Sequence, residues 1–260
     1  MGDRGRKPNA GAIPGIKVAW ESAAHVQMTR GGLSLAQTNL PPELRQILSW
    51  LSDLPQKVVE QDYSWANLTG VFGYNPKGGQ VAHFMKDEGQ SDIEAYDLSK
   101  DLILASAAKA VGVVRRSYLY MTQQPKLYRW GFGDTQGWGQ EISACLAPAL
   151  HTLQDSFSPA HVHRSQEPLF IILEIYAWDK VNKIHHSELD ASWKNSALGM
   201  AAKAASGALI KCVVLAAVDP NSQNAFQDFA QNYVVDKYLR LSVALPNWRQ
   251  NDAPTRSAFG

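Results

Sequence analysis

The sequence predicts an all-α protein that forms a single compact multi-helix domain. Apolar residues recur at helical spacing in five segments, and only one short segment fits a strand equally well. Hydrophobic residues make up 45% and charged residues 19% of the 260 residues, as in a globular protein with a full core. We expect one domain over residues 20–250, with a flexible tail at 1–19 and another at 251–260.

The first predicted helix follows two prolines, which a first helical turn tolerates, and its apolar residues recur at i, i+3, i+4 and i+7: Leu44, Ile47, Leu48 and Leu51. The same periodicity predicts helices over 96–114, 142–153, 192–217 and 226–238. The run LFIILEIY at 169–176 is short and apolar, so periodicity alone leaves helix and strand both open.

Two glycine-rich segments, 70–79 and 131–139, are predicted to be loops that flank a site. Aromatic residues in or next to them either line a substrate cleft or form the edge of the core: Phe72, Tyr74, Trp130, Phe132 and Trp138.

The net charge of +1 gives no sign of a large surface for duplex nucleic acid, although a local basic patch remains compatible with it. Residues 1–19 contain no apolar run long enough for a signal peptide, and the apolar segment 197–218 is interrupted by Lys203, Ser206 and Lys211. We therefore expect a soluble protein without a transmembrane segment. The sequence leaves its location open, including export by a non-classical route.

The most informative segment is LHTLQDSFSPAHVHR at 150–164. His151 and Asp155 are four residues apart, so on a helix they project from one face and can bind one ion. Ser158-Pro159 is expected to end that helix and to turn the chain so that His161 reaches a neighbouring ion. The two cysteines, Cys145 and Cys212, lack the Cys-x-x-Cys spacing of a thiolate zinc site.

A second pair with the same spacing, His186 and Asp190, lies in KIHHSELDASW. Either pair alone is commonly a surface ion pair or a helix cap. Together with His161 the pairs provide nitrogen and carboxylate ligands without thiolate, which is the ligand set of catalytic zinc sites with positions open for water.

The order His-x3-Asp-x5-His followed by His-x3-Asp resembles the zinc-dependent phospholipases C and their relatives, the zinc-dependent single-strand nucleases and the glycosylphosphatidylinositol-specific phospholipases. The resemblance covers residues 20–190 and implies a cleft with two or three Zn²⁺ ions. It also implies earlier ligands in AHVQMTRGGL, QDYSW and VAHFMKDEG: His25, Asp62 and His83.

The resemblance further implies which residues hold which ion. The first zinc takes Asp62, His83, His151 and Asp155, and the second takes His161, His186 and Asp190. The third takes His25, Asp155 and the backbone of Trp20.

The resemblance implies hydrolysis of phosphoric esters, with a phospholipid as the first choice of substrate and a zinc-bound hydroxide as the nucleophile. Asp62 is the expected catalytic residue, orienting or deprotonating the nucleophile, and Tyr63 and Phe84 are the expected substrate contacts. A single-strand nuclease or nucleotidase, acting on single-stranded nucleic acid, is the first alternative. The second is a non-catalytic protein with a degenerate metal site that binds a partner or a membrane surface, because Trp20 is internal here whereas the family has an N-terminal Trp.

Overall fold

The computed structural model describes residues 19–38, 40–63, 80–128, 133–166, 169–177, 189, 193–220 and 222–242. Helices make up 75% of this part of the chain, and its one sheet has two strands. The prediction of an all-α fold in one compact domain is confirmed. Of the two expected tails only Ala19 lies within the described residues, as the first residue of a helix.

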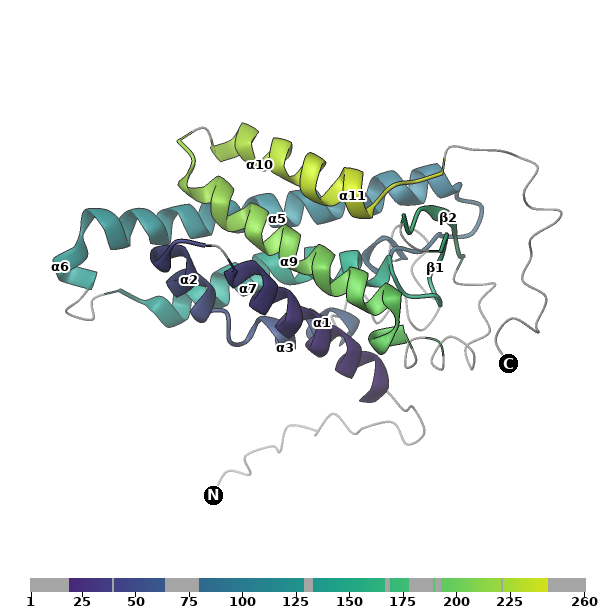
Figure 1. Cartoon of the computed structure of the whole chain (residues 1–260), viewed down its shortest axis with the longest axis horizontal. Helices are drawn as coiled ribbons and strands as arrows, with labels where there is room; N and C mark the ends of the chain where they lie inside the picture. The colour runs from purple at the N-terminus through teal and green to yellow at the C-terminus, as the bar shows by residue number, and fades with distance from the viewer. Residues whose placement is uncertain are drawn as a thin grey trace, which may run out of the picture.

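Four long helices build the core: α1 (Ala19–Gln37), α5 (Asp92–Gln123), α7 (Thr135–Asp155) and α9 (Ala197–Val218). Helix α5 packs along α7, and α1 packs along α9, which also contacts α5 and α7. Figure 1 shows α9 crossing the bundle between α5 and α1. The apolar faces of all four helices therefore meet in one hydrophobic core.

Helix α9 is the most apolar of the four. Ser196 caps its start by accepting a hydrogen bond from the backbone N–H of Gly199. It is long and apolar enough to cross a membrane by length and composition, and 67% of that apolar stretch is buried inside the molecule. The expected buried helix over 192–217 is thus present, although its first turn is a separate 3₁₀ segment at Trp193–Asn195.

Shorter elements pack around the four long helices. They are α2 (Pro42–Ser49), α3 (Leu54–Val59), α6 (Pro125–Leu127), α10 (Ser222–Ala230) and α11 (Asp236–Tyr238), the 3₁₀ turns η1 (Glu60–Tyr63), η2 (Gln80–His83) and η5 (Trp193–Asn195), and the π-helical turn η6 (Gln231–Val235). The predicted helix over 226–238 is therefore continuous in space but passes through a π-turn at its centre.

Side-chain caps set the starts of α5 and α7. Ser91 and Glu94 form a capping box, so α5 begins ahead of the predicted boundary at Tyr96. Asp134 accepts a hydrogen bond from the backbone N–H of Gly137, so α7 begins within the segment predicted to be a loop up to residue 139. That loop prediction is wrong for residues 135–139, and the loop predicted at 70–79 lies outside the described residues.

Glycine suits the first turn of α7 for a packing reason. A Cβ at Gly139 would overlap the carbonyl oxygen of Trp50, which follows α2. Gly139 thus permits a close approach between α7 and the chain that leads into α3.

The open question at 169–176 is resolved as a strand, since β2 (Ile172–Ile175) pairs antiparallel with β1 (Val162–Arg164). Val162 faces Ile175 in the register, and both are buried. This hairpin directly follows the end of α7, on the right of Figure 1.

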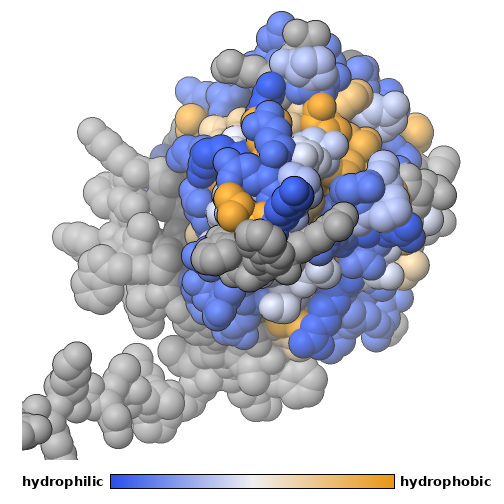
Figure 2. All heavy atoms as spheres, turned by 90° about the vertical axis from the view of Figure 1, so that its left-hand side faces the viewer, coloured by the Kyte–Doolittle hydropathy of each residue, from blue (hydrophilic) through white to orange (hydrophobic). Residues whose placement is uncertain are grey.

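The opposite end of the molecule faces the viewer in Figure 2, where most of the coloured surface is hydrophilic and the apolar groups form a limited strip. The hairpin end lies on the far side of that view, and the candidate site is found there.

Candidate metal centre

The last turn of α7 carries His151 and Asp155 on one face, as their spacing predicts. Nε2 of His151 lies 3.1 Å from Oδ2 of Asp155. Both residues are buried, with 0% and 3% of their surface exposed. The helical pair is therefore an internal feature of the protein and not a surface ion pair.

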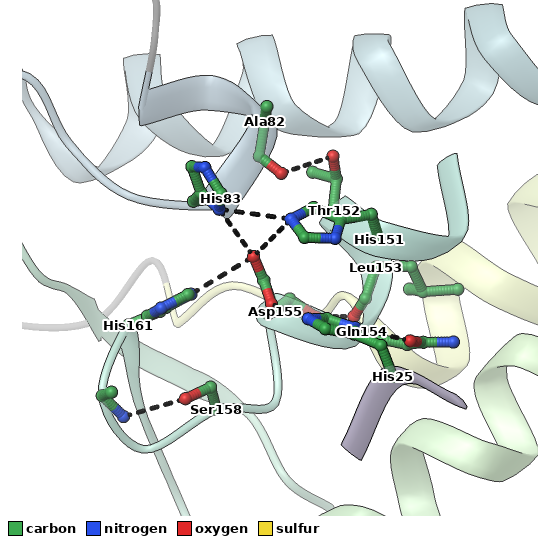
Figure 3. Close-up of polar contacts among 12 residues, drawn as sticks. His25, Ala82, His83, His151, Thr152, Leu153, Gln154, Asp155, Ser158 and His161 are labelled. Carbon is green, nitrogen blue, oxygen red and sulfur yellow. Dashed lines mark hydrogen bonds and ion pairs between the residues drawn. The ribbon is translucent and has the colours of Figure 1, made fainter. Parts of the chain in front are cut away.

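Two further imidazoles approach the same carboxylate oxygen, as Figure 3 shows. Nδ1 of His83, at the end of η2, lies 3.1 Å from Oδ2 of Asp155, and Nδ1 of His161 lies 3.6 Å from it. His161 stands in the turn between α7 and β1, because α7 ends at Asp155, ahead of the expected boundary at Ser158-Pro159. Segments far apart in the sequence thus converge on one atom.

The other carboxylate oxygen faces α1. Oδ1 of Asp155 lies 3.2 Å from Nε2 of His25, and the His25 ring stacks on His151 with 4.5 Å between centroids. Asp155 therefore has His25 on one oxygen, and His83, His151 and His161 on the other. We call these five residues the histidine cluster.

The spacing of the cluster fits a metal ion. Ligand atoms that stand about 2.0–2.1 Å from a tetrahedral zinc are about 3.4 Å apart. The nitrogen–oxygen distances in the histidine cluster run from 3.1 to 3.6 Å, and Nε2 of His151 lies 3.2 Å from Nδ1 of His83. One ligand atom from each of His25, His151 and Asp155 lies within 4.8 Å of the other two. Hydrogen bonds share these distances, so the donor set adds weight: imidazoles with a carboxylate suit zinc and other transition metals.

The charge of the cluster centres on Asp155. Burial by itself would raise the pKa of the Asp155 carboxyl, but the His151, His161 and His25 rings around it hold that pKa well below its ordinary value. The carboxylate is therefore ionised, which is the form that binds a metal. A buried anion needs a compensating cation, and imidazolium protons or a divalent ion meet that need.

Hydrogen bonds between segments fix the loops that carry the ligands. Thr152 Oγ1 donates to the carbonyl of Ala82 at 2.7 Å, which attaches η2 to α7 beside His83. The backbone N–H of Tyr176 donates to the carbonyl of His161, and Lys86 N–H donates to the carbonyl of Tyr176. The chain after β2 thus joins the His83 and His161 segments.

A buried arginine holds the end of α7 against the hairpin. The guanidinium of Arg164 donates to the carbonyl and hydroxyl of Ser156 and to the carbonyls of Phe170 and Tyr238, at 2.6 to 2.9 Å. It also lies 4.0 Å from the ring centroid of Phe157. A cation near a helix C-terminus is favourable, because the last carbonyls carry partial negative charge.

The remaining predicted site residues lie outside the histidine cluster or outside the part of the chain that the structure describes. His186 and Asp190 are not among the described residues. Trp20 lies in α1, and Asp62 and Tyr63 in η1, but only their backbone is described.

Phe84, the other expected substrate contact, is fully buried in the hydrophobic core and packs edge-on against Tyr96. Its backbone adopts a left-handed conformation with φ of 52°, which is rare for a bulky residue and turns the chain directly after His83. The position is that of a core residue, with no surface open to a ligand.

Gln154 is a buried polar residue beside the cluster, and no sequence motif indicates its role. Its Oε1 accepts a hydrogen bond from Nδ1 of His25 at 2.8 Å, and its Nε2 donates to hydroxyls of Thr29 and Ser206. Gln154 stands next to Asp155 in the sequence, but an amide is not a ligand of the predicted kind, so the ligand spacing does not indicate it.

A hollow of about 380 Å³ on the surface is lined by residues of α5, η6 and the chain around α11: Tyr96, Lys100, Gln231, Val235, Asp236 and Arg240. None of them belongs to the histidine cluster. Each of the five cluster residues has less than 9% of its surface exposed within the described chain.

Comparison with known proteins finds no matching family, no matching curated protein and no matching solved structure.

Proposed function

We propose that this chain is a zinc-dependent hydrolase of phosphoric esters that acts, like a phospholipase C, on a phospholipid. The observation that supports the proposal most is the convergence of four imidazoles on the ionised, buried carboxylate of Asp155. Four separate segments supply these imidazoles. The buried carboxylate that they surround needs a compensating positive charge, and a divalent ion would provide it.

Zinc held by such ligands supplies a water of lowered pKa and neutralises charge on a phosphoryl group. The residues of the chain set this chemistry up. Asp155 presents one oxygen to His25 and the other to His83 and His151, so these residues together would hold zinc. In this proposal Asp62, His186 and Asp190 complete the ligand set, and Asp62 also orients the attacking water.

The first experiment measures turnover of the zinc-loaded full-length protein on phosphatidylcholine vesicles and on single-stranded DNA. We expect release of the phosphorylated head group, its loss after treatment with a chelator, and its return with Zn²⁺. We expect Asp155→Asn to be inactive, because it removes the charge that both sets of histidines face. Glu174→Gln, a carboxylate change on the nearby strand β2, serves as the matched control and should keep activity.

Cleavage of DNA with no action on the vesicles would replace the phospholipase proposal with the single-strand nuclease. Retention of zinc without turnover on either substrate would overturn the enzymatic proposal.

A non-catalytic metal site is the second candidate, and the burial of the cluster favours it. Structural zinc sites are closed, whereas catalytic sites keep a position open to substrate. All five described members are buried. In that case zinc would raise the thermal stability of the protein, and Asp155→Asn would lower stability without removing any activity.

A further inference from the structure

Gln154 lies where α1, α7 and α9 meet, and it contacts one residue of the cluster directly. It belongs to α7, while Thr29 and His25 belong to α1 and Ser206 to α9. The side chains of Gln154, Thr29 and Ser206 are all fully buried. An amide in such a place must have its donors and acceptor matched, because water cannot substitute for a missing partner.

The orientation of the amide follows from Ser206. The Ser206 hydroxyl donates its only hydrogen to the carbonyl of Ala202 at 2.8 Å, so towards Gln154 it can only accept. The atom of Gln154 that lies 3.1 Å from Ser206 Oγ must therefore be the NH₂ group, which also reaches Thr29 Oγ1 at 3.0 Å. The carbonyl oxygen Oε1 is left to face His25.

The orientation of Gln154 in turn fixes the proton of His25. Oε1 has only lone pairs, so the His25 nitrogen 2.8 Å away, Nδ1, must carry a hydrogen. In the neutral ring the other nitrogen, Nε2, then has a lone pair, and it faces Oδ1 of Asp155 at 3.2 Å. Two acceptors at this distance repel unless a proton or a metal ion lies between them.

We propose that Gln154 is a positioning residue that selects the tautomer of His25, so that Nε2 and not Nδ1 binds the metal. The inference rests on the proposed metal centre and adds a role for a residue that is not itself a ligand. Ser206 and Thr29 hold Gln154 in place, and Gln154 holds the proton on the outer nitrogen of the ligand. Partners of this kind orient a ligand and raise its basicity.

The test compares zinc affinity across variants of the full-length protein, by competition with a chromophoric chelator. We expect Gln154→Leu to weaken zinc binding about 10- to 100-fold, as the loss of a ligand's hydrogen-bond partner usually does. Gln154→Glu keeps the acceptor for His25 and should retain affinity better than the leucine variant. Ser206→Ala frees the amide to turn and should weaken binding by less than Gln154→Leu.

Ser117→Ala is the matched control for Ser206→Ala. Ser117 is also fully buried in a long helix and donates to the carbonyl four residues earlier, but it lies in α5 and has no contact with the cluster. We expect its zinc affinity to equal that of the unmodified protein.

A second readout, independent of affinity and of activity, is the ¹⁵N spectrum of the histidine side chains. In the zinc-loaded protein His25 should show a protonated Nδ1 and a metal-bound Nε2. A protonated Nε2, or equal zinc affinity in Gln154→Leu and the unmodified protein, would overturn the role of Gln154 while leaving the metal centre in place. If the unmodified protein binds no zinc, the proposed metal centre and the inference both fall.

Discussion

His83 and His151 face each other across the cluster, with Nδ1 of His83 lying 3.2 Å from Nε2 of His151. Each of these nitrogens also lies 3.1 Å from the same oxygen of Asp155. Three polar atoms this close need a proton or an ion among them. Because the group is buried, the choice between proton and metal affects the stability of the whole domain.

Removal of the proposed zinc is expected to lower the stability of the protein. An ion that binds only the folded chain stabilises it by about 2.7 kcal/mol when its free concentration is about 100 times its Kd. Thermal unfolding with and without a chelator measures this difference, and Zn²⁺ should restore the higher Tm. Equal Tm values in the two conditions would argue that protons and not a metal balance the cluster.

Two histidines of one segment should behave differently. His161 lies in the cluster, whereas His163 lies on β1 opposite Glu174, on the strand positions paired in the hairpin. We expect His161→Ala to lower zinc affinity by about 10-fold or more and His163→Ala to leave it unchanged. Isothermal titration of both variants with Zn²⁺ measures this, and the reverse order would show that the segment is positioned differently in solution.

The buried Arg164 should contribute far more to the free energy of unfolding than an exposed arginine does. Arg164→Leu leaves the carbonyls of Ser156, Phe170 and Tyr238 without their donor, and we expect a loss of about 3 kcal/mol in the free energy of unfolding. Denaturation in urea measures the loss.

The control is Arg116→Leu, which breaks the exposed ion pair with Glu141 and should cost less than about 1 kcal/mol. Similar losses in the two variants would contradict the proposal that Arg164 stabilises the end of α7 against the hairpin.

Cys212 gives a pH dependence whose sign follows from its burial. Loss of solvation raises the pKa of the Cys212 thiol to about 12, from 9.0 for an unperturbed thiol. Between pH 9 and pH 12 the folded chain keeps the thiol proton while the unfolded chain releases it. The stability that comes from burying the neutral thiol is therefore complete below pH 9 and is lost as the pH rises towards 12. At pH 10 the loss is about 1.4 kcal/mol.

Comparing the free energy of unfolding of the protein and of Cys212→Ala from pH 8 to pH 10 isolates this effect, since the other groups titrate in both. The difference between the two proteins should shrink by that amount.

In the native state at pH 8, a thiol reagent should modify the half-buried Cys145 and leave Cys212 intact.

The sequence predicts most of the helical fold because its apolar spacing is regular. It also places His151 beside Asp155, because a four-residue separation on a helix has one geometric outcome. The boundaries were less predictable. Asp134 caps a helix in a segment where glycines indicated a loop, and Gly139 lets that helix pack closely against Trp50. Ile172 to Ile175 form a strand only because they pair with β1.

The site was predictable only in part. His25 and His83 reach Asp155 from α1 and η2 through tertiary packing, and no local spacing in the sequence specifies those contacts; the family resemblance alone indicated them. The resemblance assigned His161 to a different ion from His83, whereas both face the same oxygen of Asp155. Gln154 was missed because its role depends on hydroxyls from two other helices.

The most direct test of the metal centre is X-ray absorption at the zinc edge of the full-length protein after loading with zinc and removal of the excess. We predict a first shell of nitrogen and oxygen at about 2.0–2.1 Å, with the outer scattering of several imidazoles, and its loss in Asp155→Asn. A shell of sulfur, or zinc that washes away completely, would contradict the account.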